Sequence, residues 1–181
     1  MTDTFVELNK HEAKKYGKEL YNKWKTTLTI GEKVCLKMYK FSSVMINKNA
    51  RRNKHSKRIY NISNAIQKSV IDKNIIVYRE SHLDFLQSNN TTMQEVEVGD
   101  LLKEKGFMST FLYRPKMVFK GKVRLKIKVP RGTHGAYIDE ISCIHKWENE
   151  MLFDKGMRLR VTNKNINKGI LLLDVILEEK E

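Results

Sequence analysis

The first seventy residues alternate apolar and polar positions with the period of an α-helix. Apolar residues recur at three- and four-residue steps with lysine and glutamate between them, which forms one stripe along each helix. After a break at Thr29–Gly31 the same spacing resumes. We expect every stripe to face the core. The stripes are Ala13, Tyr16, Leu20, Trp24 and Leu28, then Ile30, Val34 and Met38, and finally Ile59, Ile62, Ile66 and Val70.

From Ile75 onward the pattern changes to the two-residue period of a β-strand. Ile75–Tyr78 is a short run of β-branched and aromatic residues, which is typical of a buried strand. Residues 123–129 place valine, leucine and isoleucine on one face and lysine and arginine on the other. Residues 157–161 alternate in the same way, and residues 170–177 form a last apolar run. We expect strands in all four segments.

Helices first and strands afterwards predict an α+β fold. Within the second half, Leu101–Lys105 is predicted as a short helix that Gly106 caps. A length of 181 residues suits one sizeable core and is short for two. We therefore expect a single domain over residues 1–181, with a helical part over 1–74 and a β-rich catalytic part over 75–181.

The positive charge lies mainly in the helical part. The net charge is +14, and residues 1–74 carry 17 Lys and Arg against 6 Asp and Glu. Asn47–Arg58 holds six cations and no acid. This segment is either a solvated face or a surface for nucleic acid, for a negative membrane, or for an acidic protein or phosphate-bearing ligand. It has no interleaved aromatic residues and no nucleic-acid-binding signature, which argues against nucleic acid.

Several classes of protein are excluded by what the sequence lacks. No apolar run approaches 18 residues, so no membrane span is predicted, and the first ten residues lack the apolar stretch of a secretory signal. Two cysteines, Cys35 and Cys143, cannot form a disulfide framework. No metal-binding spacing such as CxxC or HExxH is present, so we expect no metal.

Three polar pieces in the β-rich part carry candidate chemistry. Tyr78-Arg79 ends the strand that begins at Ile75, Ser109-Thr110 lies on a predicted strand, and Glu148 and Glu150 are two residues apart. In an extended segment residues i and i+2 point the same way, so these two glutamates would share a face. Each piece alone is usually an ordinary surface feature, and their combination is the signal.

The order Arg79, Ser109-Thr110, Glu148-x-Glu150 resembles the Arg–Ser–Glu signature of the mono-ADP-ribosyltransferase toxins. The likeness extends from about residue 13 to the C-terminus and includes Phe107 and the segment VPRGTHGAYI. It is closest to the actin-modifying enzymatic components of binary toxins, in a compact form like the Rho-modifying exoenzymes. The family motif usually reads Ser-Thr-Ser, whereas this chain has Phe111 at the third position, which puts the third hydroxyl's support of the sheet in question.

The resemblance implies a helical N-terminal subdomain packed on two roughly perpendicular, mainly antiparallel β-sheets that enclose an NAD cleft. It implies transfer of ADP-ribose from NAD to an arginine of a host protein, with actin favoured and nicotinamide released. The implied protein is a secreted toxin that acts in the host cytosol as a monomer, with a separate translocation component. NAD is the substrate, and no metal, nucleic acid or membrane span is expected.

The chemistry of NAD cleavage assigns roles to the motif residues. Nicotinamide is already a cationic leaving group, so the reaction mainly needs stabilisation of the oxocarbenium ion that develops at the ribose. Glu150 is expected to supply that negative charge, with Ser109 holding its carboxylate in position. Arg79 is expected to anchor the NAD phosphates, because its fork donates two parallel charge-assisted hydrogen bonds.

Glu148 indicates which side chain of the target protein accepts ADP-ribose. A guanidinium is a poor nucleophile because it stays protonated, so attack by arginine needs a carboxylate that orients it and accepts a proton. In the family, glutamate at this position accompanies arginine modification and glutamine accompanies asparagine modification. We therefore expect an arginine acceptor.

Further site residues follow from the resemblance alone. The expected NAD-contacting residues also include Thr110, Phe119, Tyr39, Asn47 and the Arg51-Arg52 pair, and Trp147 is expected to recognise the target protein.

Three other interpretations remain open. The same cleft would serve an NAD glycohydrolase, in which water replaces the protein acceptor. An asparagine transferase of the Rho-modifying type is disfavoured only by Glu148. A non-enzymatic basic module that binds nucleic acid or an acidic surface is supported by the charge alone.

Overall fold

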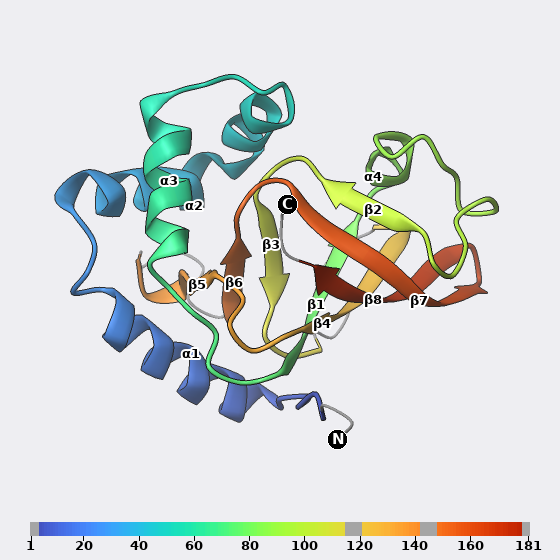
Figure 1. The fold of residues 1–181 in the computed structure, drawn as a ribbon, viewed down its shortest axis with the longest axis horizontal. Helices are drawn as coiled ribbons and strands as arrows, with labels where there is room; N and C mark the ends of the chain where they lie inside the picture. Colours follow the sequence, from blue (N-terminus) through green and yellow to red (C-terminus); the bar gives the residue numbers. More distant parts are fainter. Residues whose placement is uncertain (1–3, 115–120, 142–147, 179–181) are drawn as a thin grey trace.

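The computed structural model describes residues 4–114, 121–141 and 148–178. Helices come first and strands follow, so the predicted α+β order is confirmed (Figure 1). The helices are α1 (Lys10–Trp24), α2 (Ile30–Arg51), α3 (Lys57–Gln67) and the short α4 (Asp84–Gln87), with a 3₁₀ turn, η1 (Asp139–Ile141). The strands are β1 (Ile75–Ser81), β2 (Leu101–Glu104), β3 (Met108–Phe111), β4 (Val123–Val129), β5 (Gly135–Tyr137), β6 (Glu150–Phe153), β7 (Met157–Asn167) and β8 (Ile170–Glu178).

The helices begin where the sequence supplies capping residues. Asn9 and Thr29 each form a reciprocal capping box, with Glu12 and Glu32 respectively, and Ser56 caps α3. These side chains satisfy backbone N–H groups that have no partner inside the helix. The break between the first two helices lies between Trp24 and Ile30, so the predicted break is confirmed at Thr29 but not at Gly31, which lies inside α2. Among the described residues, no helix is long and apolar enough to cross a membrane.

The first apolar stripe is buried as predicted, from Ala13 to Leu28. The prediction for the second stripe is wrong, because Ile30, Val34 and Met38 are exposed. Helix α2 instead packs through another apolar face, and its buried hydrophobic residues are Cys35, Leu36, Tyr39, Ile46 and Ala50. A helix that is apolar on two sides gives the sequence pattern no means of choosing between them.

The third stripe is buried at Ile59, Ile62 and Ile66 but not at Val70, where the prediction is wrong. Helix α3 ends at Gln67, so Val70 no longer follows the helical period. Its backbone forms an isolated bridge with His134 instead.

The strands form one hydrogen-bonded ladder in the order β2-β7-β8-β4-β1-β3-β6-β5. Neighbours pair antiparallel except β4 and β8, which are parallel. Strands β1 and β3 pair at a single position, Tyr78 opposite Phe111. This narrow joint divides the ladder into two parts, which Figure 1 shows running in different directions. These parts correspond to the two sheets of the expected fold.

Two apolar clusters hold the layers together. Between the two parts of the ladder, residues such as Val77 and Leu125 share a cluster with Met108 and Met151. A second cluster joins the helices to β5, to β6 and to Phe107, which precedes β3, and it packs Trp24, Leu36 and Ile62 against Phe107 and Leu152. Its Trp24 indole Nε1 donates a hydrogen bond to the carbonyl of Ala65 at 2.7 Å. The helices thereby pack against β6, which carries Glu150, and against Phe107, which directly precedes β3 and Ser109.

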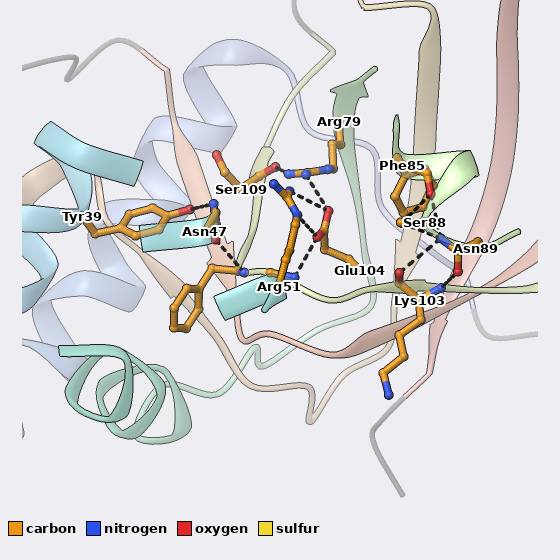
Figure 2. Close-up of polar contacts among 12 residues, drawn as sticks. Tyr39, Asn47, Arg51, Arg79, Phe85, Ser88, Asn89, Lys103, Glu104 and Ser109 are labelled. Atoms are coloured by element: carbon orange, nitrogen blue, oxygen red, sulfur yellow. Dashed lines mark hydrogen bonds and ion pairs between the residues drawn. The ribbon is translucent and has the colours of Figure 1, made fainter. Parts of the chain in front are cut away.

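Leu101–Glu104 is strand β2, so the predicted short helix is wrong. The segment pairs with β7, and burial alternates along it. The side chain of Asn89 also accepts a hydrogen bond from the Lys103 amide at 2.6 Å and donates one to the Lys103 carbonyl at 3.2 Å (Figure 2). Pairing with a distant strand outweighs local helix propensity here.

Candidate active site

Ser109 and Glu150 meet on adjacent antiparallel strands. Strands β3 and β6 pair over their full lengths, with Ser109 opposite Leu152 and Phe111 opposite Glu150. The Ser109 hydroxyl donates a hydrogen bond to Glu150 Oε1 at 2.6 Å. The side chain of Glu150 is only 8% exposed. A serine donor thus fixes the orientation of a nearly buried carboxylate.

Lys40 of α2 lies among three carboxylates. Its Nζ donates to Glu150 Oε2 at 2.6 Å and lies 3.5 Å from Asp139 Oδ1 and 3.6 Å from Glu148 Oε2. Its side chain is 3% exposed. Burial alone would lower the pKa of Lys40, but the three carboxylates outweigh this and raise it, so Lys40 remains an ammonium. A single lysine in a basic helix gives no sequence signal of this role, and sequence analysis missed it.

Asp139 holds the turn that carries the two glutamates. Its carboxylate accepts hydrogen bonds from the Asn149 amide at 2.6 Å and the Glu150 amide at 3.2 Å. Burial raises the pKa of Asp139 above its ordinary value, against the opposing effects of Lys40 and the two amides. Sequence analysis did not single out this residue either.

Glu148 and Glu150 come together by a different geometry from the one predicted. Asn149 has a φ of 49°, in the left-handed region, so the segment is not an extended strand and the i, i+2 argument does not describe it. The Asn149 side chain accepts a hydrogen bond from the Tyr137 hydroxyl at 3.1 Å, which braces the turn. One oxygen of each of Asp139, Glu148 and Glu150 lies within 4.8 Å of the others.

Glu104 joins the two arginines predicted to contact NAD. Arg79 Nη2 donates to Glu104 Oε2 at 2.8 Å, and Arg51 Nε donates to Oε1 at 3.2 Å (Figure 2). Arg79 Nη1 also donates to the Ser109 carbonyl at 2.7 Å. Arg79 Nε is buried and has no hydrogen-bond partner among the described residues. Sequence analysis missed Glu104, which lies in the segment wrongly predicted to be helical.

Tyr39, Asn47 and Thr110 are engaged in contacts within the protein. Asn47 donates to the Tyr39 hydroxyl at 3.1 Å and accepts from the Phe107 amide at 2.8 Å, which ties α2 to the start of β3 (Figure 2). The pKa of Tyr39 is raised above its ordinary value, mainly because the side chain is buried. The Thr110 hydroxyl is buried and donates to the Met151 carbonyl at 3.0 Å, tying β3 to β6.

A cavity of about 230 Å³ opens beside these groups. Its lining includes Arg79, Ser109, Phe111 and Glu148. The Glu148 side chain is 20% exposed, more than that of Glu150. The cavity therefore combines an arginine fork, a serine bonded to a carboxylate and a second carboxylate nearer to solvent. Two predicted contacts, Phe119 and Trp147, lie outside the described residues.

Comparison with known families identifies the family of the chain. The family model of the ADP-ribosyltransferase exoenzymes matches residues 13–179 of the sequence. The chain belongs to this family. The resemblance seen in the sequence is therefore confirmed, and the protein is an ADP-ribosyltransferase exoenzyme by family. No curated protein sequence matches the chain.

Solved structures of ADP-ribosyltransferase exoenzymes and related toxins share the fold. Plx2a, an ADP-ribosyltransferase toxin from Paenibacillus larvae, is 24% identical with a TM-score of 0.84, and 99% of this chain aligns with 100% of that one. C3stau2 from S. aureus, solved with NAD, is 22% identical with a TM-score of 0.81 and coverages of 99% and 100%. BECa, an ADP-ribosylating toxin of a C. perfringens binary enterotoxin solved with NADH, is 22% identical with a TM-score of 0.79. There 97% of this chain aligns with 50% of the other.

Proposed function

We propose that this exoenzyme cleaves NAD at its nicotinamide N-glycosidic bond and transfers ADP-ribose to an arginine of a host protein, with actin as the favoured acceptor. The observation that carries the proposal is the Glu150 carboxylate, held by Ser109 on one oxygen and Lys40 on the other, next to the cavity that Arg79 and Glu148 line. The NAD and NADH in the C3stau2 and BECa structures support NAD as the substrate.

Glu150 is the proposed catalytic carboxylate. When the bond from the ribose anomeric carbon to the nicotinamide nitrogen breaks, its electron pair leaves with nicotinamide, and positive charge develops on the ribose. A carboxylate fixed in place before the reaction stabilises that charge without reorganising. Ser109 and Lys40 each occupy one Glu150 oxygen at 2.6 Å, which restricts the carboxylate to one orientation.

Arg79 is the proposed phosphate anchor. Its two terminal nitrogens each donate to a fixed acceptor, which sets the plane of the guanidinium. The buried Nε and the remaining terminal N–H groups are left to donate to an anion in the cavity. Buried donors without partners are rare in folded proteins, so the Nε is a natural donor for a ligand oxygen.

Glu148 is the proposed base for an arginine acceptor. An arginine nitrogen attacks the anomeric carbon as nicotinamide leaves, and the proton that the guanidinium loses passes to a Glu148 oxygen. Glu148 lines the cavity and is more exposed than Glu150, which suits contact with an incoming protein. Phe119 remains a proposed NAD contact, and Trp147 keeps its proposed role in recognising the target protein.

The proposed setting is that of a secreted toxin. We infer that the chain acts as a monomer in the host cytosol on a host protein and reaches it with a separate translocation component. Incubating the protein with NAD and purified actin, and locating the modified residue by tandem mass spectrometry, tests the acceptor. Modification of an arginine supports the proposal, whereas modification of an asparagine or of no residue contradicts it.

NAD glycohydrolysis is the second candidate function. Ser109 and Lys40, which donate hydrogen bonds to Glu150, both belong to this chain. These bonds are therefore in place before any protein acceptor arrives. Water reaching the same cavity would then complete hydrolysis. Release of nicotinamide in the absence of acceptor measures this activity directly.

A further inference from the structure

Helix α2 exposes a row of apolar side chains on the side away from the core. The row continues past a kink at Ser42, and its members are between 37% and 83% exposed. Large apolar residues gathered on one exposed face mark a surface that contacts another apolar phase. We call this row the α2 outer face, and it consists of Ile30, Val34, Met38, Phe41, Val44 and Met45.

The α2 outer face belongs to a firmly seated helix. On its other side, Leu36, Tyr39 and Ile46 are almost fully buried in the cluster beneath the helices. The exposure therefore does not come from a helix that lacks a core contact. A surface helix normally has one apolar side, and a second one implies a second apolar contact. From Ile30 to Met45 the row extends about 22 Å along the helix, at roughly 1.5 Å per residue.

Cations accompany this row, and exposed acids do not. Lys33, Lys37 and Lys48 of α2 are exposed. The one acid in the α2 sequence, Glu32, is buried and paired with Lys68 at 2.8 Å. The exposed Arg52, Lys54 and Lys57 extend the positive charge beyond the helix.

We propose that the α2 outer face docks on an anionic lipid bilayer. Its apolar side chains would enter the boundary between headgroups and acyl chains, and the lysines would extend to the anionic headgroups. The bilayer interface offers hydrocarbon and negative charge along a flat surface, which matches both components of the face. A second copy of this chain would bring the same cations together, so charge opposes self-association through this face.

Docking would also fix the catalytic cavity relative to the membrane. The same helix carries Lys40, whose side chain points into the site, so a bound α2 sets the orientation of the site. This proposal goes beyond the proposed function and does not depend on it.

Vesicle co-sedimentation tests the proposal. Vesicles of phosphatidylcholine alone and vesicles with about 30% phosphatidylserine are compared, because anionic lipid supplies the attractive surface potential. We expect binding only to the anionic vesicles, and weaker binding at about 0.5 M salt, where charges are screened within a few ångströms. The absence of binding to anionic vesicles, or equal binding to both kinds, would overturn the proposal.

Variants distinguish docking through this face from general charge attraction. The triple variant Phe41→Gln, Val44→Gln, Met45→Gln should bind anionic vesicles at least about tenfold more weakly, because it removes the inserting residues. Val98→Gln, at an equally exposed apolar residue away from α2, should bind like the wild type. Both proteins should keep the wild-type rate of nicotinamide release from NAD and the wild-type melting temperature. Wild-type vesicle binding by the triple variant would overturn the proposal, as would a concentration-dependent dimer that the triple variant abolishes.

Discussion

Lys40 Nζ lies 2.6 Å from Glu150 Oε2, and this buried contact joins helix α2 to strand β6 across 110 residues of sequence. The same ammonium lies within 3.6 Å of Asp139 and Glu148. Three carboxylates so close together repel one another and favour retention of a proton. Lys40 supplies a positive charge that offsets this repulsion, and it opposes the rise that burial causes in the pKa of Asp139. We therefore expect Lys40 to be a positioning residue that acts through Glu150 and Glu148.

Replacing Lys40 should change the pH dependence of the reaction. In Lys40→Met the three carboxylates lose their buried cation, and Asp139, whose pKa burial already raises against the opposing effect of Lys40, retains its proton to higher pH. Tyr39, which precedes Lys40 in α2, stays neutral because burial raises its pKa. The acidic limb of the rate profile should shift upward, with at least about a tenfold loss near pH 6 that recovers as the pH rises.

Two variants control this experiment. Lys40→Arg keeps the charge and should retain much of the wild-type profile, whereas Lys37→Met removes an exposed lysine of the same helix and should leave the profile unchanged. A uniform loss at every pH in Lys40→Met would show a purely structural role.

Glu150→Gln should abolish both transfer to protein and NAD hydrolysis. The amide has nearly the same shape but no charge to stabilise the oxocarbenium ion, so we expect a loss of about a thousandfold or more. Quenched-flow or steady-state release of nicotinamide measures it. Glu178→Gln, a charge-matched change at an acid paired with Arg160 on β7, should keep wild-type activity. Near-wild-type NAD cleavage by Glu150→Gln would remove Glu150 from the catalytic role.

NAD should raise the melting temperature, because a ligand that binds only the native state stabilises it by mass action. Arg79→Lys should weaken NAD binding by about tenfold, because the lysine ammonium is a point charge and cannot donate the two parallel hydrogen bonds of the arginine guanidinium. Arg160→Lys, away from the cavity, is the matched control. The stabilisation by NAD should depend little on salt concentration. Binding of nucleic acid would instead weaken steeply as salt is added, because it depends on counterion release. Unchanged NAD affinity in Arg79→Lys would exclude the phosphate role.

Glu32 is expected to stabilise the fold in a pH-dependent way. Burial pushes the pKa of Glu32 upward, but hydrogen bonds from Lys68 and Thr29 outweigh it and leave the pKa below its ordinary value. A lowered folded-state pKa adds stability near neutral pH that disappears as the pH falls through that value. Glu32→Gln should therefore lower the free energy of unfolding by about 1–2 kcal/mol at neutral pH and by much less near pH 3.

The matched control is Glu12→Gln, which alters the exposed capping box of α1 without removing a lysine partner. Denaturant unfolding at both pH values should show a smaller loss for Glu12→Gln. Equal losses in the two variants would show that the Lys68 contact adds nothing to the Glu32 cap.

The sequence identified the motif residues but not the groups that position them. Ser109, Glu148 and Glu150 were found because their order forms a recognisable pattern. Lys40 and Asp139 come from a helix and a 3₁₀ turn that carry no such pattern, and their roles exist only once α2 packs beside β6. Long-range contacts of this kind depend on the fold rather than on local spacing.

The errors in the predicted fold have physical causes of the same kind. Leu101–Glu104 became a strand because β7 supplies a partner, which no local propensity can report. Ile30, Val34 and Met38 were predicted to be buried because periodicity identifies an apolar side but not what covers it. Sequence patterns thus predicted the order of elements well, and failed where another part of the chain decides the outcome.

The central claim is that Glu148 serves the arginine acceptor while Glu150 serves NAD cleavage. Water needs no base to lose a tightly held proton before it attacks an oxocarbenium ion, whereas a guanidinium does. Losing one positioned base costs about a hundredfold, or roughly 3 kcal/mol of barrier. The decisive measurement compares Glu148→Gln with the wild type, using labelled NAD with and without actin to follow transfer and hydrolysis separately. We predict that transfer to arginine falls about a hundredfold while hydrolysis falls much less. Equal loss of both activities would contradict the account and its arginine specificity.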